Sequence, residues 1–595
     1  MRSPPTSSAT STNTESVRPR PPSSRSSRRC RRNAVRSGKE SWLTTSPKAS
    51  LSADYFRTEI SRWQARSMTI STRGIVSAES PLAAQAGAVV LARGGHAAEA
   101  AIAANAVMGV VAPMMNGVGG DLFAIVHDAA SGAVHGLNAS GWSPAGMSIE
   151  FLSARGMKAM PQAGIHSVTV PGAVAGWMAL HGKFGRMPLE TILSAAIAHA
   201  EEGYPVSEIM SLEWAGSVAA LQTNRNATAT YLPDGRAPAA GDLFRKPALA
   251  RTLRAIARDG ADAVYRGDVA KLILNCSVEQ GGAFDASDLA EYEAEWVSPL
   301  TTNYRGWEVY EMPPNSQGIA ALVMLNILEN FPLGEYGCGT ADTLHLMIEA
   351  KKLAFADMQR HIGDPRFSKM PVEAMLSKAY ARQRAALIDP RHAKASVDAG
   401  QLPTHGGDTT YLCAVDASGN ICSLIQSNFA NFGSAVVPDG AGFVLQSRGG
   451  LFTFDRSHPN ALAPRKRPLQ TVIPAFMKRD QMSIGFGVMG GWNQPQAHVQ
   501  VISNVVDHGL NIQQALEAPR FVKLTFPGTD VIVESRVPEG VRQALERRGH
   551  DIDLQSDFSN MVGGGQAVIH DARAKVNYGG SDPRKDGAAI PEPIL

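Results

Sequence analysis

The chain has 595 residues, of which 44% are hydrophobic and 19% are charged, and its formal net charge is +3. This length and composition predict a globular α/β protein with one large two-lobed unit or several domains. The chain lacks a run of 18 uncharged apolar residues, so no membrane span is predicted. Five sparse cysteines without a C-x-x-C pair argue against a disulfide framework and indicate a reducing, cytoplasmic location: Cys30, Cys276, Cys338, Cys413 and Cys422.

The basic charge is concentrated at the beginning of the chain. Residues 1–67 hold 14 Lys and Arg against 4 Asp and Glu, so the remaining residues carry a net charge of −7. This Ser-, Pro- and Arg-rich arm cannot bury a core and is expected to be disordered. Three interpretations stay open: a segment that binds nucleic acid or an anionic surface, a targeting segment, or sequence upstream of a true start at Met68. The core itself is not expected to bind nucleic acid.

From Thr69 onward, Ala-rich and Gly-rich segments predict helices packed closely on a sheet. The first expected elements are Ala-rich helices within 80–95 and 96–113, a glycine turn with two strands within 116–140, mainly helix over 167–300, and a strand that enters a Pro-rich loop within 303–318. A long helix is predicted to start on a capping Thr340 or Asp342 and to stop before Gly363.

Strand pairs dominate the last third of the chain. The expected pairs are 410–415 with 421–427 and 474–478 with 482–489, followed by helices within 494–509 and 511–521. Helices, antiparallel strands and helices again predict a layered α/β protein with helices outside two sheets.

The segment "GFGVMGG" contains G-x-G-x-x-G at Gly485, Gly487 and Gly490. A dinucleotide site is disfavoured, because the preceding strand is predicted to pair as a hairpin and no parallel strand follows at βαβ length. The glycines are better explained by close packing of a sheet. Gly490 and Gly491, at a strand end ahead of a helix, also offer backbone N–H groups that suit an oxyanion.

Asp408-Thr409-Thr410 begins a predicted strand directly after His-Gly-Gly at 405–407. A threonine hydroxyl is a weak nucleophile unless a base lies beside it, and a chain-terminal α-amine, with a pKa of about 7.7–8.0, is such a base. Residue 409 carries this amine only if the Asp408–Thr409 bond is cut. The stretch is therefore either a self-cleavage site with a flexible approach or a plain strand start.

The chain from about residue 72 to 590 resembles the γ-glutamyltransferase family of N-terminal-nucleophile amidohydrolases. The matching segments occur in serial order: "GGHAAEAAIAA", "NGVGGDLF", "VPGAVAGW", "YRGWEVYEMPPNSQG", "EAKKLAFADMQRHIGDPRF", "GDTTYLCAVDASGN", "APRKRPLQTVIP", "GVMGG", "LNIQQALEAPRF" and "GGSDPRKDGAA". The resemblance implies a four-layer αββα sandwich with additional helices from the large subunit. It also implies cleavage between Asp408 and Thr409, which would give a large subunit 68–408 (or 1–408) and a small catalytic subunit 409–595. These would form one intertwined heterodimer, with a dimer of heterodimers as a further possibility.

By the same resemblance, Thr409 is the nucleophile. Gly490 and Gly491 match the family's oxyanion glycines, and Ser427, 18 residues after the nucleophile, matches a hydroxyl thought to support it. Gln470 and Thr471 stand where the transferases carry a Ser-Ser pair that contacts substrate.

Two positions depart from the transferases. Trp142 stands near their Arg for the glutamyl α-carboxylate, and Leu451 or a neighbouring glycine stands near their Asp for the α-amine. The sequence is more similar here to the acylase and oxamate amidohydrolase branches. Arg448 remains as a cation that would bind a carboxylate through two parallel hydrogen bonds.

The sequence thus predicts an autocatalytically processed amidohydrolase or acyltransferase that cleaves γ-glutamyl or related small amides through an acyl-Thr409 intermediate. Its partner would be a small-molecule amide. No cofactor or metal is expected, because P-loop, H-E-x-x-H and zinc-spaced motifs are missing. One alternative is a hydrolase of oxamate-like or acyl amides with little γ-glutamyl activity. The other is an unprocessed, non-catalytic scaffold or binding protein.

Overall fold

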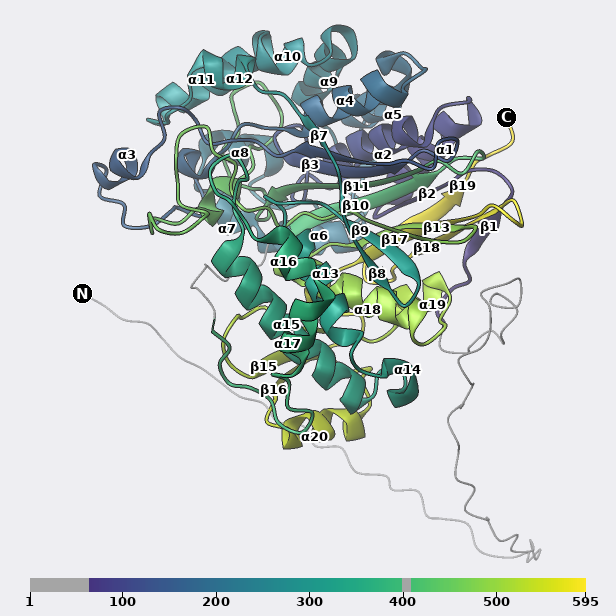
Figure 1. Ribbon diagram of the computed structural model, residues 1–595. Helices are drawn as coiled ribbons and strands as arrows, with labels where there is room; N and C mark the ends of the chain where they lie inside the picture. Colours follow the sequence, from purple (N-terminus) through teal and green to yellow (C-terminus); the bar gives the residue numbers. More distant parts are fainter. Residues whose placement is uncertain (1–63, 399–407) are drawn as a thin grey trace, which may run out of the picture. The chain divides into compact units, whose positions relative to one another are not determined.

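The computed structural model describes residues 64–398 and 408–595 (Figure 1). Two predicted features therefore lie outside the described residues: the arm, apart from its last four residues, and the flexible approach at 405–407. Two seven-stranded sheets lie face to face, with helices on both outer faces. The predicted αββα sandwich is confirmed.

The first sheet contains the predicted hairpin at residues 408–429. Its strand order is β19-β2-β10-β11-β3-β4-β7, and every neighbouring pair is antiparallel. Asp416 closes the hairpin turn because its Oδ1 accepts the N–H groups of Ser418 and Asn420. The bounds are β19 Ala588–Pro591, β2 Ile75–Ala78, β10 Asp408–Val415, β11 Ile421–Phe429, β3 Asp121–His127, β4 Val134–Ala139 and β7 Glu295–Val297.

The second sheet contains the other predicted strand pair, and its order is β1-β18-β17-β13-β12-β9-β8. The strand expected within 303–318 is one arm of a hairpin, because Arg305 and Gly306 adopt positive φ and reverse the chain. Both sheets contain strands from before and after residue 408. The bounds are β1 Thr69–Ser71, β18 Val576–Ser581, β17 Gly565–Asp571, β13 Met482–Val488, β12 Ala475–Arg479, β9 Trp307–Glu311 and β8 Leu300–Tyr304.

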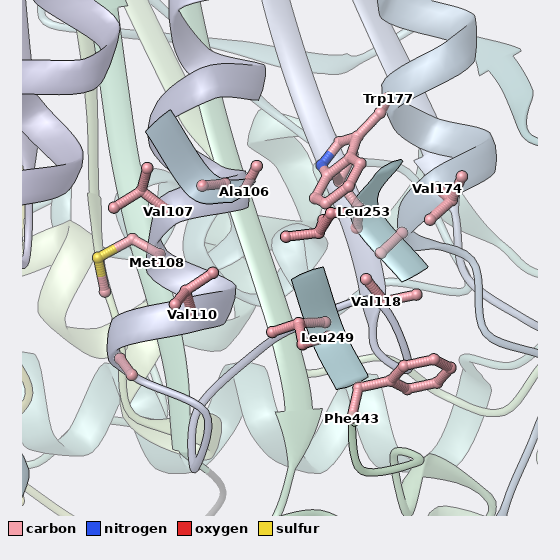
Figure 2. Close-up of a cluster of buried hydrophobic side chains, with 14 of the residues drawn as sticks. Ala106, Val107, Met108, Val110, Val118, Val174, Trp177, Leu249, Leu253 and Phe443 are labelled. Carbon is pink, nitrogen blue, oxygen red and sulfur yellow. The ribbon is translucent and has the colours of Figure 1, made fainter. Parts of the chain in front are cut away.

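One outer layer is built around the Ala-rich helix α2, which is buried along its whole length and packs on β10 and β11. Small alanine side chains let α2 lie close to the sheet, while Trp177 of α4 and Leu249 and Leu253 of α9 fill the space beside it (Figure 2). The helices of this layer are α1 Pro81–Ala92, α2 Ala97–Val111, α4 Ala173–Phe184, α5 Leu189–Glu202 and α9 Pro247–Asp259.

The opposite outer layer covers the second sheet (Figure 1). It comprises α13 Gly318–Leu328, α15 Ala341–His361, α18 Gln494–Val506 and α19 Ile512–Glu517. Helix α15 confirms the predicted long helix, since Thr340 caps its first turn and the helix ends before Gly363. No helix within residues 64–398 and 408–595 combines the length and apolar character that a bilayer crossing requires.

The layer between the sheets explains two of the glycines in "GFGVMGG". Tyr411, Cys413 and Val415 alternate along β10 and point toward the second sheet, whereas Leu412 and Ala414 point toward α2. A Cβ atom at Gly485 would lie 2.6 Å from Ile421 Cγ2, and one at Gly487 would lie 2.5 Å from the Tyr411 ring. These glycines let the sheets approach closely, in agreement with the packing interpretation.

The remaining elements surround the sandwich. The helices are α3 Ile149–Ser153, α6 Glu208–Gly216, α7 Val218–Leu221, α8 Arg225–Tyr231, α10 Asp262–Tyr265, α11 Asp268–Glu279, α12 Ala286–Ala290, α14 Leu333–Tyr336, α16 Val372–Leu376, α17 Lys378–Ala385 and α20 Glu539–Arg547. The short strands are β5 Tyr204–Pro205, β6 Leu243–Phe244, β14 Phe521–Val522, β15 Asp530–Glu534 and β16 Asp551–Gln555, and the 3-10 helices are η2 Ile165–Ser167, η3 Arg448–Leu451, η4 Gly491–Asn493 and η5 Asn560–Val562.

Candidate active site

Thr409 is the second residue of β10, and its side chain is fully buried. The pairing with β11 is irregular here, because Asp408 pairs with Phe429 but Thr410 pairs with Gln426. Such a bulge turns a side chain away from its regular position. Thr409 Oγ1 lies 3.3 Å from Ser427 Oγ and 3.4 Å from Gln494 Nε2.

Ser427 lies on β11, directly across the hairpin from the nucleophile candidate. Its Oγ accepts the Phe429 N–H at 2.8 Å and the Thr409 hydroxyl at 3.3 Å. Ser427 also pairs with Asp121 on β3, so a carboxylate-bearing residue occupies the next strand at the same level. The structure therefore brings together the two hydroxyls that the sequence predicted to cooperate.

Gly490 and Gly491 follow the end of β13 and have φ angles of +121° and +58°. Glycine adopts these angles without the strain that a Cβ atom would cause. The turn is held because Asn493 N–H donates to Gly490 O at 3.0 Å and Asn493 Nδ2 donates to Val562 O at 2.7 Å. Within the described ranges neither glycine N–H donates a hydrogen bond, so both groups are available to bind an oxyanion.

Arg448 and Asp121 form a fully buried ion pair, with Nε 3.2 Å from Oδ2. Gln470 Nε2 also donates to Asp121 Oδ2 at 3.2 Å, and Gly141 N–H donates to Oδ1 at 3.0 Å. Arg448 Nη1 donates to Thr471 Oγ1 at 2.6 Å. Burial raises the pKa of Asp121 and lowers the pKa of Arg448 to about 10, so the guanidinium stays cationic near neutral pH.

Two buried polar atoms of this cluster have no hydrogen-bond partner among residues 64–398 and 408–595. They are Arg448 Nη2, a donor, and Gln470 Oε1, an acceptor. The guanidinium also lies over the Phe429 ring, 4.7 Å from its centroid. Buried polar atoms are normally paired, so these two atoms are available to a polar ligand group.

Within the described residues, the side chains of Trp142 and Leu451 make no hydrogen bond or ion pair with this polar cluster. The Trp142 indole donates to Asp288 O at 3.2 Å and packs edge-on against Tyr292. Trp142 thus makes its hydrogen bond and ring contact with residues outside the Arg448 cluster. Leu451 is buried in the hydrophobic cluster of the second outer layer and offers no charge.

Sequence reasoning missed Asp121 and Gln494 as site residues. Asp121 opens a strand whose next five residues are apolar, and a charge at such a position was an available signal. Gln494 begins α18 only three residues after Gly491, in "GGWNQPQ". Neither contact follows from sequence spacing, because the partners lie far apart along the chain.

One group of potential metal ligands occurs within the described ranges, and it lies outside this site. The ligand atoms of His345, Glu349 and His550 all lie within 4.8 Å of one another. However, His345 Nδ1 and His550 Nε2 are already hydrogen-bonded at 2.8 Å, and Lys352 Nζ binds Glu349 Oε1 at 2.7 Å. Because a buried ammonium already neutralises the carboxylate, this group is better described as a structural polar network.

The site can carry out acyl transfer. The buried Thr409 hydroxyl contacts the Ser427 hydroxyl and the Gln494 amide. The N–H groups of Gly490 and Gly491, at the turn just before Gln494, donate no hydrogen bond within the described residues. Together with the αββα sandwich, this arrangement defines the class as a hydrolase of the N-terminal-nucleophile type.

The comparisons with known proteins agree with this class. The Gamma-glutamyltranspeptidase family model matches residues 83–592. A glutathione hydrolase-like YwrD proenzyme of Bacillus subtilis is 36% identical and covers 88% of this chain and 99% of its own length. An oxamate amidohydrolase proenzyme of Klebsiella pneumoniae is 33% identical with the same coverage. The crystal structure of a cephalosporin acylase from Bacillus halodurans is 39% identical, covers 92% of this chain and 99% of its own, and superposes with a TM-score of 0.84.

The chain belongs to the gamma-glutamyltranspeptidase family. It is an enzyme of the autocatalytically processed amidohydrolase and transferase type, as the resemblance implied.

Proposed function

We propose that this enzyme hydrolyses a small amide whose acyl part carries a carboxylate and lacks an α-amine. The reaction would pass through an acyl ester on Thr409, freed by cleavage after Asp408, with the two resulting subunits held together as a heterodimer. The oxyanion of the tetrahedral intermediate would bind the N–H groups of Gly490 and Gly491.

The observation that carries this proposal is which hydrogen bonds the buried Asp121–Arg448 ion pair already makes. Both carboxylate oxygens of Asp121 already accept hydrogen bonds, so this residue is poorly suited to bind a substrate ammonium. Arg448 retains Nη2 without a partner among the described residues, and its charge favours a carboxylate. A γ-glutamyl group carries an α-ammonium that would lose water without gaining a matching anion.

The name of one relative supports the same direction. Oxamate is an amide that carries a carboxylate and no α-amine, and an oxamate amidohydrolase is among the relatives. A γ-glutamyl substrate such as glutathione is the second candidate, because another relative is named glutathione hydrolase-like.

The test is kcat/KM of the matured enzyme for glutathione, oxamate and a glutaryl amide, measured in parallel. We expect the two amides without an α-amine to be preferred. Arg448→Lys should lower kcat/KM for the preferred amide by roughly 10- to 100-fold, because one charge-assisted pair contributes about 1.5–3 kcal/mol.

Arg384→Lys is the matched control, since Arg384 also pairs with a buried aspartate, Asp357, but in the helical layer that contains α15. It should leave kcat/KM within about twofold of the wild type, because the hydrogen bonds of Arg384 go to Leu353 O and Asp357 and not to the residues around Thr409 or Arg448. A clear preference for glutathione would contradict the proposal and favour the γ-glutamyl alternative.

A further inference from the structure

Gln494 lies in direct contact with the candidate nucleophile. It is the first residue of α18, its side chain is fully buried, and its Nε2 lies 3.4 Å from Thr409 Oγ1. This distance is long for a hydrogen bond, but catalytic hydrogen bonds are often long before substrate binds and shorten in the reacting complex.

The orientation of the Gln494 amide is set by a backbone group. Ile473 N–H donates to Gln494 Oε1 at 2.9 Å. A backbone N–H can only donate, so the atom that faces Ile473 must be the amide oxygen. The NH₂ end must then face Thr409 Oγ1, and it can only donate to this oxygen.

This contact also directs the Thr409 hydroxyl. Since Oγ1 accepts from Gln494, its own hydrogen is left to point at Ser427 Oγ, 3.3 Å away. Oγ1 is thus held between one donor and one acceptor, and Gln494 supplies the donor.

We infer that Gln494 is a further catalytic residue, which stabilises negative charge on Thr409 Oγ1 during acyl transfer. The inference rests on the acyl-Thr409 reaction proposed above. In acylation, the Thr409 hydroxyl proton passes to the freed α-amine while Oγ1 bonds to the amide carbon, whose carbonyl oxygen takes the π electron pair. Collapse restores the carbonyl and expels the amine, which takes that proton.

In deacylation, water attacks the ester carbon and gives a proton to the α-amine. Oγ1 then leaves with the bonding electron pair and recovers this proton. Charge builds up on Oγ1 as it attacks and again as it departs, and a donor fixed on Oγ1 binds most strongly at those moments.

The experiment compares Gln494→Met, Gln494→Glu and a control, Gln500→Met, as purified and fully matured protein. Gln500 is also a buried glutamine of α18, but its amide bonds Phe521 N and O, away from Thr409. We expect Gln494→Met to lower kcat about 10- to 100-fold with KM changed less than about twofold, and Gln500→Met to leave kcat near the wild-type value.

The pH dependence of kcat in Gln494→Glu distinguishes a catalytic role of Gln494 from a purely structural one. This isostere keeps an oxygen for Ile473 N–H but replaces the donor with an ionisable oxygen. Its kcat should be lowest at neutral pH and should rise relative to the wild type as the pH falls, because a protonated carboxyl donates again. A wild-type pH profile in Gln494→Glu, or equal losses of kcat in Gln494→Met and Gln500→Met, would overturn the inference.

The rate of self-cleavage is a second readout that needs no substrate. Thr409 Oγ1 also attacks in that step, so Gln494→Met should mature more slowly than Gln500→Met on a denaturing gel. If the wild type prefers another amide than the one proposed, kcat is measured on that amide. That result would overturn the substrate proposal for Arg448 and leave the test of Gln494 intact.

Discussion

Thr409 Oγ1 and Ser427 Oγ lie 3.3 Å apart across the β10–β11 hairpin, although 18 residues separate them in the chain. The hairpin register brings the two residues together, and the bulge at Thr409 turns its hydroxyl toward β11. The strand start that looked ordinary in the sequence is therefore a buried, hydrogen-bonded nucleophile position.

Self-cleavage is the first prediction. The purified chain should split between Asp408 and Thr409 without added protease, because the Thr409 hydroxyl adjoins that bond. N-terminal sequencing should find a fragment of 187 residues that begins Thr-Thr-Tyr-Leu. A chain that stays intact after prolonged incubation would instead favour the non-catalytic scaffold alternative.

Removal of the two hydroxyls should have unequal effects. Thr409→Ala should abolish cleavage and lower amide hydrolysis by about a thousandfold or more, because the same oxygen attacks in both steps. Ser427→Ala removes the acceptor of the Thr409 hydroxyl and of Phe429 N–H and should cost roughly tenfold in kcat. Gel assays of maturation and initial-rate kinetics measure both effects. Normal maturation of Thr409→Ala would show that another residue is the nucleophile.

The resemblance to the family supplied the roles of Thr409, Ser427, Gly490 and Gly491. The sequence patterns themselves were sufficient for the layers and the two strand pairs. Each of these depends on local patterns, such as alternation along β10 or the turn at Asp416. The ion pair between Asp121 and Arg448 was not predictable in the same way, since 327 residues separate the partners and they lie on different elements, β3 and η3.

Two short strands were missed for a different physical reason. β1 and β2 span three and four residues, which is too short for an alternating pattern to be distinguished from a loop. The contact of Gln494 with Thr409 depends on how the start of α18, a helix of the layer over the second sheet, reaches β10 of the first sheet, and "GGWNQPQ" carries no signature of this arrangement.

Gly487→Ala should destabilise the sandwich without touching the acyl-transfer groups. The added methyl would lie 2.5 Å from the Tyr411 ring, between two sheets that have no room to separate. Overpacking of this kind costs about 1–3 kcal/mol, so the midpoint of thermal unfolding should fall. Gly182→Ala in α4 is the matched control, because its Cβ would meet no atom within 4 Å and alanine favours a helix. Equal midpoints for the two variants would refute the packing role of Gly487.

The buried pair of His345 and His550 should make the folded protein less stable in acid. Burial lowers the pKa of both rings, to about 3 for His550, where His345, Lys352, Lys523 and Arg548 add to the effect. Histidine in an unfolded chain titrates near about 6.5, so below this pH the unfolded state binds more protons than the folded state. The stability present above pH 6.5 is therefore lost as the pH falls toward 3, by at most about 1.4 kcal/mol per pH unit for each proton.

We expect His550→Gln to flatten the dependence of Tm on pH between about 7 and 5, whereas His392→Gln, whose side chain is 74% exposed, should leave it unchanged. Thermal unfolding of the wild type and the two variants across this pH range measures the effect. If Tm depends on pH as steeply in His550→Gln as in the wild type, the buried histidine pair is not the cause of the loss of stability in acid.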